Sequence, residues 1–346
     1  MEAITDARII FGRQRARRRT VFWLLSLATL SLMAINLRVG TAGYSAAEIF
    51  RALLSFSDQG DIGFVVWRLR LPRTLATVMG GAYLAAAGLL LQVYFRNPIV
   101  EPFILGISSG ATLAVSLVML TTAGIKLSLV TPFLITLAGC AGGLIVMILV
   151  AALAARVRSG TTLLVMGLMI GYVCSSGTSV VTALAEREKV KAFVLWGLGS
   201  FAGLRWTEIL IMAGLGGILT ASVAILARPL NAFLLGEDYA ASMGVSVRRF
   251  RLYILLTASS LAGLVTAMAG PVAFIGLAVP HIARLTLGTS DNRVLVPCVC
   301  LTGAAVTTLC DMIARMWLSP VELPVSAITA FFGAPIVITL LLGRGG

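Results

Sequence analysis

The sequence consists largely of apolar runs of about twenty residues, and these runs recur along its whole length. A helix of that length crosses the roughly 30 Å hydrocarbon layer of a membrane. The composition agrees, because 59% of the 346 residues are hydrophobic and only 12% are charged, about half the charged share of a soluble domain. The sequence therefore predicts an all-α, polytopic membrane protein with about ten transmembrane helices. We place them at residues 21–37, 64–95, 103–120, 129–155, 161–185, 206–227, 248–268, 274–288, 294–315 and 324–343.

Positive charge near the N-terminus predicts how the chain is oriented. Six arginines lie within residues 1–20, just ahead of the first span, and short flanks rich in arginine and lysine usually stay cytoplasmic. Ten spans then return the C-terminus to the same side. We therefore expect a cytoplasmic basic tail at residues 1–20 and one membrane domain at residues 21–346. This topology and contact with lipid headgroups account for the net charge of +13, and we expect no nucleic-acid partner.

Several kinds of chemistry lack the residues they need in this sequence. The phosphate-binding pattern GxxxxGK[ST] is missing. The acidic residues lie near predicted span ends or in loops, whereas an ion-coupled carrier usually places a carboxylate at membrane depth. The only histidine, His281, has no ligand-type neighbours, and the cysteines form no CxxC pair. We therefore expect no enzymatic activity, no cofactor and no metal site. An ion-coupled secondary carrier, although the position of the carboxylates disfavours it, is the alternative function of another class.

A short polar island, GEDYAASMGVSVRRFR at residues 236–251, separates two long apolar stretches. The predicted topology places it on the cytoplasmic side. Glu237 and Asp238 would open a small helix that Gly244 ends, since glycine readily adopts the left-handed conformation that follows many helices. The residues after Gly244 are strongly basic. An exposed polar helix between two membrane spans is suited to contact with a partner subunit.

A second group of charges lies at the outer end of two predicted spans. Arg68, Arg70 and Arg73 crowd the start of the second span, although orientation rules favour positive charge on the opposite side. Arg315 follows Asp311 by one helical turn near the end of the ninth span. One interpretation is an intrahelical ion pair, worth only a few tenths of a kcal/mol. The other joins Arg315 to Arg70 and Arg73 as an outward-facing basic set that meets acidic residues of a partner.

Four segments resemble the iron-siderophore, haem and vitamin B12 permease family of bacterial ABC importers, also called the FecCD type. They are residues 69–111, the GEDYAASMGV part of the polar island, GPVAFIGLAVPHIARL at 270–285 and the segment 311–342. The segments occur in the family's order and at its spacing, and they cover nearly the whole chain from about residue 64. The resemblance implies the type II ABC importer permease fold for residues 21–346.

The resemblance also implies a set of partners. In that family two permease chains form the pore as a homodimer, and two ATP-binding cassette subunits attach to its cytoplasmic face. A periplasmic or surface-tethered binding protein delivers the substrate from the other side. ATP and magnesium would then be bound by the partner ATPase subunits, so that this chain would hydrolyse nothing itself.

Family motifs match particular positions of this sequence. The RLPR and DMIAR motifs imply that Arg70, Arg73 and Arg315 dock the binding protein. The ATPase-coupling helices match residues 231–247, in which we single out Gly236, Glu237, Asp238, Ala240, Ala241, Met243 and Gly244. The cytoplasmic gate matches Asn97, Ile99, Gly160 and Thr161, although the family usually has leucine at position 99 and often a hydroxyl residue at position 160.

The resemblance limits the substrate to a metal chelate. Ferric siderophore is the main expectation, and haem and cobalamin are the alternatives, because the family moves all three through similar scaffolds. We expect a multi-pass protein of the bacterial cytoplasmic (inner) membrane with both termini in the cytoplasm. The spans at 64–95, 161–185 and 294–315 are our candidates for the pore walls. The segments 101–110 and 271–281 echo each other weakly, as inverted repeats of transporters do.

Overall fold

The protein is described here from a computed structural model, which covers residues 2–40, 43–55, 57–121, 132–154, 156, 160–319 and 321–342. Apart from an isolated bridge between Leu318 and Val321, the regular structure of these residues is helical. The helices are α1 (Glu2–Arg38), α2 (Ala46–Leu54), α3 (Gly60–Phe64), η1 (Val65–Arg70), α4 (Leu71–Phe95), α5 (Ile107–Leu120), α6 (Pro132–Ala154), α7 (Gly160–Leu184), α8 (Arg187–Gly197), α9 (Trp206–Ile211), η3 (Met212–Gly216), α10 (Gly217–Ile225), α11 (Ala227–Leu235), α12 (Glu237–Ser242), α13 (Val247–Ala269), α14 (Ile275–Leu287), α15 (Asn292–Met316) and α16 (Val325–Leu342).

Each of the ten predicted spans coincides with a helical segment. Within the described residues, seven of these segments are long and apolar enough to cross a membrane, and three are shorter apolar helices: α5, α14 and α16. The second predicted span is a continuous helical segment of 36 residues, Gly60–Phe95, which includes a π-helical turn at η1. The prediction of an all-α, multi-span membrane protein is confirmed.

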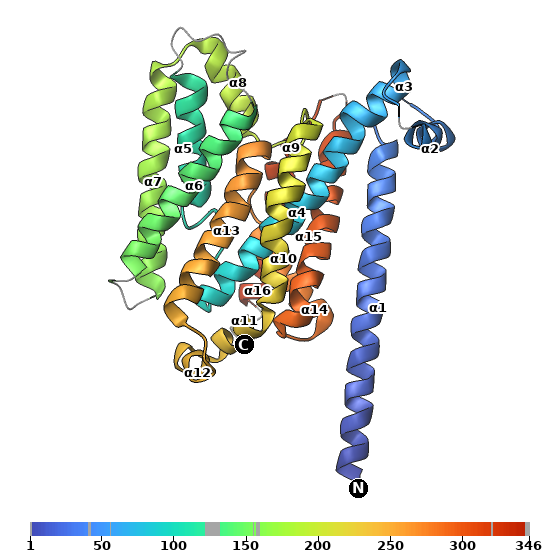
Figure 1. Cartoon of the computed structure of the whole chain (residues 1–346). Helices are drawn as coiled ribbons and strands as arrows, with labels where there is room; N and C mark the ends of the chain where they lie inside the picture. Colours follow the sequence, from blue (N-terminus) through green and yellow to red (C-terminus); the bar gives the residue numbers. More distant parts are fainter. Residues whose placement is uncertain are drawn as a thin grey trace.

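Helix α4 occupies the centre of the bundle and runs obliquely between α13 and α15 (Figure 1). Small residues allow this close packing, because a side chain at Gly81 would overlap the carbonyl oxygen of Gly303 on α15. Further along α4, a side chain at Gly88 would overlap the carbonyl oxygen of Gly276 on α14. In lipid, where no hydrophobic force drives helices together, such contacts supply the packing energy.

The central position of α4 corrects one expectation. Residues 64–95 and 294–315 were predicted to line a pore, but most of α4 and α15 is buried inside the chain. Of the three candidates only α7 presents a largely exposed surface, which includes Tyr172, Val173 and Leu184. Two of the three candidate walls are therefore core helices.

Helix α1 lies at the edge of the bundle (Figure 1), and arginines fasten it at two places, within the helix and at its C-terminal end. The guanidinium of Arg17 donates to the carbonyl oxygens of Leu285 and Thr286, at the end of α14. At the C-terminal end of α1, Arg70 donates to the carbonyl oxygens of Leu37 and Arg38, each at 3.0 Å. The last carbonyl groups of a helix have no partner within it and carry partial negative charge, so arginine is well suited to both places.

The two segments with similar sequence, 101–110 and 271–281, lead into the short helices α5 and α14. Each helix begins after a residue in the left-handed conformation, Gly106 (φ 76°) and Phe274 (φ 68°). The two segments also touch, because the backbone N–H of Phe274 donates to the Glu101 carboxylate at 3.1 Å. The weak sequence similarity therefore corresponds to two segments that each lead into a short helix through a left-handed residue. These two segments pack against each other.

Candidate docking and coupling surfaces

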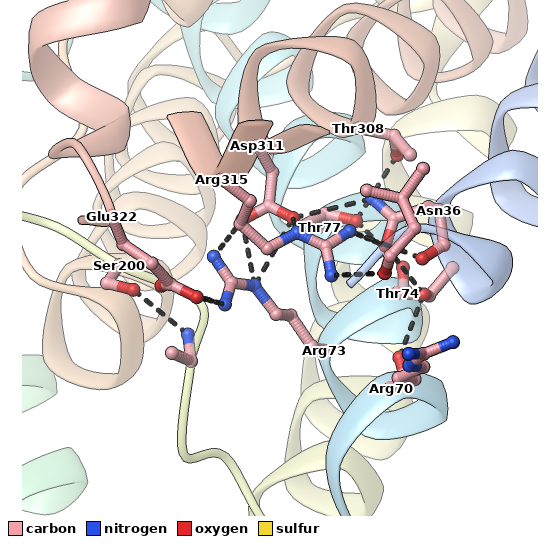
Figure 2. Close-up of polar contacts among 12 residues, drawn as sticks. Asn36, Arg70, Arg73, Thr74, Thr77, Ser200, Thr308, Asp311, Arg315 and Glu322 are labelled. Atoms are coloured by element: carbon pink, nitrogen blue, oxygen red, sulfur yellow. Dashed lines mark hydrogen bonds and ion pairs between the residues drawn. The ribbon is translucent and has the colours of Figure 1, made fainter. Parts of the chain in front are cut away.

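Two polar regions lie at opposite ends of the bundle, and the first is a cluster where α4 begins and α15 ends (Figure 2). At its centre Arg73 binds two carboxylates at once. Its Nε and Nη2 donate to Asp311 at 3.0 and 2.9 Å, and its Nη1 donates to both oxygens of Glu322 at 2.9 and 3.0 Å. Asp311 is completely buried, whereas the side chain of Glu322 is 47% exposed.

Arg315 and Arg70 flank this pair and bind the end of α1. Arg315 forms the expected ion pair with Asp311, Nε to Oδ2, at 3.4 Å, and it also donates to the side-chain and backbone oxygens of Asn36. Arg70 lies over the ring of Tyr44, 5.6 Å from its centroid, in addition to its bonds to α1. The ion pair of the first interpretation is therefore present, and the three arginines lie together as the second interpretation expects.

The outer cluster, defined as Asn36, Arg70, Arg73, Asp311, Arg315 and Glu322, borders an open cavity of about 690 Å³. The expectation of an exposed basic set needs correction, because Arg70 and Arg73 are buried and Arg73 and Arg315 already have carboxylate partners within the chain. The cavity is nevertheless basic, with four arginines and one glutamate among its lining residues. They are Ile35, Arg38, Val39, Gly40, Val65, Leu69, Arg70, Arg73, Ala202, Gly203, Arg315, Met316, Ser319 and Glu322.

The second polar region is the polar island, which the structure places at the opposite end of the bundle, around α12 (Figure 1). Helix α12 ends as the sequence predicts. Gly244 has a φ of 82°, its N–H donates to Ala241, and the N–H of Val245 donates to Ala240. This is the Schellman arrangement of a helix C-terminus, which favours glycine. A side chain at Gly244 would meet no atom within 4 Å, so the backbone conformation alone requires glycine here.

The residues predicted to couple to the ATPase divide into supporting and exposed ones. Glu237 forms an ion pair with Arg251 at 2.5 Å, which fastens α12 to α13, and Ala240 is fully buried. Met243 is 64% exposed. Two further apolar side chains, one just before α12 and one within it, are also exposed, Leu235 at 72% and Tyr239 at 47%. Of the remaining predicted residues, Asp238 and Ala241 are exposed and Gly236 is partly buried.

Beneath the polar island lies a base of aromatic rings from three helices. The ring of Phe233 on α11 stacks on Tyr94 at the end of α4, with 6.4 Å between centroids. It also packs against Phe250 of α13 at 5.7 Å, and Phe250 stacks on Tyr253 at 6.1 Å. The position of the island is therefore tied directly to the inner end of the central helix.

A second contact ties α11 to the turn between α14 and α15. The side-chain amide of Asn231 donates to Asp291 at 2.7 Å, and its oxygen accepts from the backbone and side chain of Asn292 at 2.8 and 2.9 Å. Although burial alone would raise the pKa of Asp291, the bond from Asn231 and the N–H and charge of Arg293 hold it below its usual value. The carboxylate thus remains an acceptor for Asn231.

The predicted gate residues are only partly placed together. Asn97 follows the left-handed end of α4 at Arg96, and its side-chain oxygen accepts the N–H of Ile99 at 3.0 Å. Ile99 is 39% exposed. Gly160 and Thr161 are the first residues of α7, and their side chains lie outside the described residues.

Next to the predicted gate residues lie polar contacts that the sequence did not predict. Gln92 donates to the carbonyl oxygens of Gly276 and Leu277, both at 3.2 Å, and its own oxygen accepts from Arg284 at 2.8 Å. Glu101 is buried in the loop between α4 and α5, and burial raises its pKa to about 7. The only hint in the sequence was the proximity of Glu101 to Asn97; nothing in it indicated contact with a segment 173 residues away.

Comparison with known proteins agrees with this arrangement. The chain matches the profile of the FecCD transport family over residues 27–343. The vitamin B12 import system permease proteins BtuC of Salmonella typhi and of Salmonella newport are each 34% identical over 336 residues, which is 96% of this chain and 98% of theirs. These matches span almost the full length of both partners, so they concern the whole fold rather than one motif.

Two solved structures are similar. One is a metal-chelate type ABC transporter in an inward-facing conformation, with a TM-score of 0.80, 28% identity and coverage of 94% of this chain and 99% of that chain. The other, PsaBC from Streptococcus pneumoniae in complex with Fab, has a TM-score of 0.55 at 14% identity over 85% of this chain and 95% of that chain, and it supports the fold alone. The expected type II permease fold is thus confirmed, and the chain is an ABC importer permease of the FecCD transport family.

Proposed function

We propose that two copies of this chain form the pore of a metal-chelate importer, driven by two ATP-binding cassette subunits that carry the ATP and magnesium. The observation that carries the proposal is the polar island, which exposes Tyr239 and Met243, beside the exposed Leu235 that precedes it, at one end of a chain of the FecCD transport family. An exposed apolar group on a rigid, polar base is what a partner's cleft recognises. This chain supplies the conduit and contributes no catalytic group.

Movement of the polar island is the proposed coupling step. ATP binding would draw the two ATPase subunits together and shift α12. The ion pair from Glu237 to Arg251 and the aromatic base would then transmit this shift to α13 and to the inner end of α4. A ligand changes a conformation only through contacts that differ between the two states. The gate at Asn97 and Ile99 directly follows α4, so a tilt of α4 would open or close it; Gly160 and Thr161 would complete the gate from α7.

The outer cavity is the proposed docking site for the binding protein. Its four arginines would attract carboxylates on the binding protein, and Arg70, Arg73 and Arg315 would fix the register of the complex. Charges of this kind mainly set the rate of association and the orientation of a partner. The sidedness follows from the polar island: the cavity lies at the opposite end and therefore faces outward.

Ferric siderophore is the proposed cargo, and cobalamin is the second candidate. The names of the similar BtuC proteins favour cobalamin, whereas the similar solved structure is described only as a metal-chelate transporter. Haem belongs to the same range of substrates. Uptake of radiolabelled ferric siderophore and of radiolabelled cyanocobalamin by the same proteoliposomes would assign the cargo directly.

We place the chain in the bacterial cytoplasmic membrane with both termini inside. Reporter fusions at each terminus and at the polar island should all report the cytoplasm, and a fusion in the α2–α3 region should report the outside. A reporter signal from outside at the polar island would overturn the coupling role.

Reconstitution tests the function itself. Proteoliposomes that contain the complete transporter should accumulate the chelate only with internal ATP and external binding protein. Accumulation by the purified chain alone, abolished by collapse of the proton gradient, would instead establish an ion-coupled carrier.

A further inference from the structure

The two carboxylates bound to Arg73 differ in a way that suggests different roles. Asp311 is fixed within α15 and completely buried. Glu322 lies in the segment between α15 and α16, on the edge of the outer cavity, and nearly half of its side chain is exposed. A buried ion pair is costly to open because it leaves a charge without water or partner. An exposed carboxylate can exchange at little cost, because water replaces its lost contacts.

The position of Glu322 is also the position that an incoming carboxylate would take. Glu322 occupies the Nη1 side of Arg73 with both oxygens, at 2.9 and 3.0 Å, while Asp311 holds the Nε and Nη2 side (Figure 2). Glu322 therefore covers the Nη1 side of the guanidinium at the rim of the cavity. A carboxylate that binds Arg73 through Nη1 must therefore displace Glu322.

We propose that Glu322 is an internal counter-ion that covers Arg73 in the free permease and is displaced by an acidic side chain of the binding protein on docking. The inference rests on the proposed docking function and names how that site is regulated. Arg73 has two carboxylate partners before and after the exchange, so the donors of its guanidinium are occupied in both states. The exchange thus lowers the affinity of docking and suits a partner that must dissociate in every transport cycle.

The backbone around Glu322 is compatible with such a movement. The N–H of the next residue, Leu323, donates to Ala314 at 2.9 Å, and the N–H of Val325 donates to Gly199 at 3.0 Å. The backbone on the C-terminal side of Glu322 is thus held while the side chain lies on the rim of the cavity. Rotation of the side chain alone would release Arg73 without unwinding α15 or α16.

Binding of the importer's own binding protein, labelled with a fluorophore, to the assembled transporter tests this inference. Glu322→Gln removes the competing charge and should tighten binding by about two- to fivefold, the range that corresponds to a partly exposed ion pair. Asp58→Asn is the matched control, because it removes a carboxylate from another exposed ion pair at the same end, with Arg68. A general gain in positive charge would strengthen binding equally in both variants and would overturn the proposal.

A double-mutant cycle locates the effect at Arg73. Arg73→Lys retains a positive charge for Asp311 but cannot bind two carboxylates side by side, so Glu322→Gln should give little further gain in that background. Assembly with the ATPase subunits reports that each variant is folded. Unchanged or weaker binding in Glu322→Gln, with binding lost in Arg315→Gln, overturns the counter-ion and leaves docking intact. Unchanged binding in both Arg73→Lys and Arg315→Gln overturns the docking function itself.

Discussion

The outer cluster and the polar island are both rich in charge, yet the chain uses that charge in opposite ways. In the outer cluster Arg73 and Asp311 are buried against each other, and Arg315 completes the pair. In the polar island the one ion pair, Glu237 with Arg251, is partly exposed and supports a surface of apolar side chains. The first region uses its buried charges for internal structure and offers a partner only the residues that line the cavity, whereas the second region leaves apolar side chains open to a partner. A charged motif near a membrane surface is therefore not in itself a docking site.

The difference between the two regions should be largest in stability. Asp311→Ala removes the carboxylate that Arg73 and Arg315 share and leaves two buried cations close together. We expect a loss of about 3–5 kcal/mol, the usual cost of breaking a buried ion pair from one side. Thermal unfolding of the purified chain in detergent measures it. Asp58→Ala is the control at an exposed pair with Arg68, where we expect less than about 1 kcal/mol; similar losses in both would remove the distinction.

Much of this molecule was predictable from its sequence. The recurring apolar runs predicted the helices, and the position of Gly244 predicted the end of α12, because both depend on local patterns. The resemblance grouped the three outer arginines correctly. The carboxylate partners of Arg73 were not predictable, because Asp311 and Glu322 lie 238 and 249 residues away from it in the sequence. The burial of α4 was equally hidden, since a helix that is apolar on all sides can face lipid, a pore or other helices.

The inner end of the bundle carries a buried carboxylate of its own, and it predicts a dependence of stability on pH. Burial raises the pKa of Glu101 from 4.5 to about 7, so the folded chain keeps a proton that the unfolded chain releases. Protonation of Glu101 therefore stabilises the folded chain fully below about pH 4.5. As the pH rises from there to about 7, the free energy of unfolding should fall by about 3 kcal/mol. In Glu101→Gln this part of the pH profile should be flat. A variant that unfolds with the same pH dependence as the natural chain would contradict the assignment.

The polar island should show the reverse of the outer cluster, with a loss of binding and no loss of stability. Tyr239→Ala and Met243→Ala remove exposed side chains, so we expect the unfolding temperature to stay unchanged. Each should weaken binding of the ATPase subunits about tenfold, the effect of about 1.4 kcal/mol at a central interface residue. Leu318→Ala, which alters a side chain that is 56% exposed at the outer end, should leave that affinity unchanged. A fall in unfolding temperature with normal binding would make these residues structural.

The smallest effect tests whether the backbone, rather than charge, gives the polar island its shape. Gly244→Ala adds one methyl group in open space but forces a non-glycine residue to a φ of 82°, which costs about 1 kcal/mol. Gly197→Ala is the matched control, because that position is also open but lies at the end of helix α8 with an ordinary φ. We expect the control to be neutral or slightly stabilising, since alanine favours helix.

The same two variants separate local shape from overall stability. If the Schellman turn positions Met243, Gly244→Ala should weaken binding of the ATPase subunits as well as lowering the unfolding temperature, because Met243 is the residue just before the turn. Gly197→Ala should leave the affinity for the ATPase subunits unchanged and should not lower the unfolding temperature. If Gly244→Ala binds the ATPase subunits normally despite its lower stability, the glycine turn does not position Met243. The Glu237–Arg251 ion pair and the aromatic base would then hold the polar island in place, much as ion pairs hold the outer cluster.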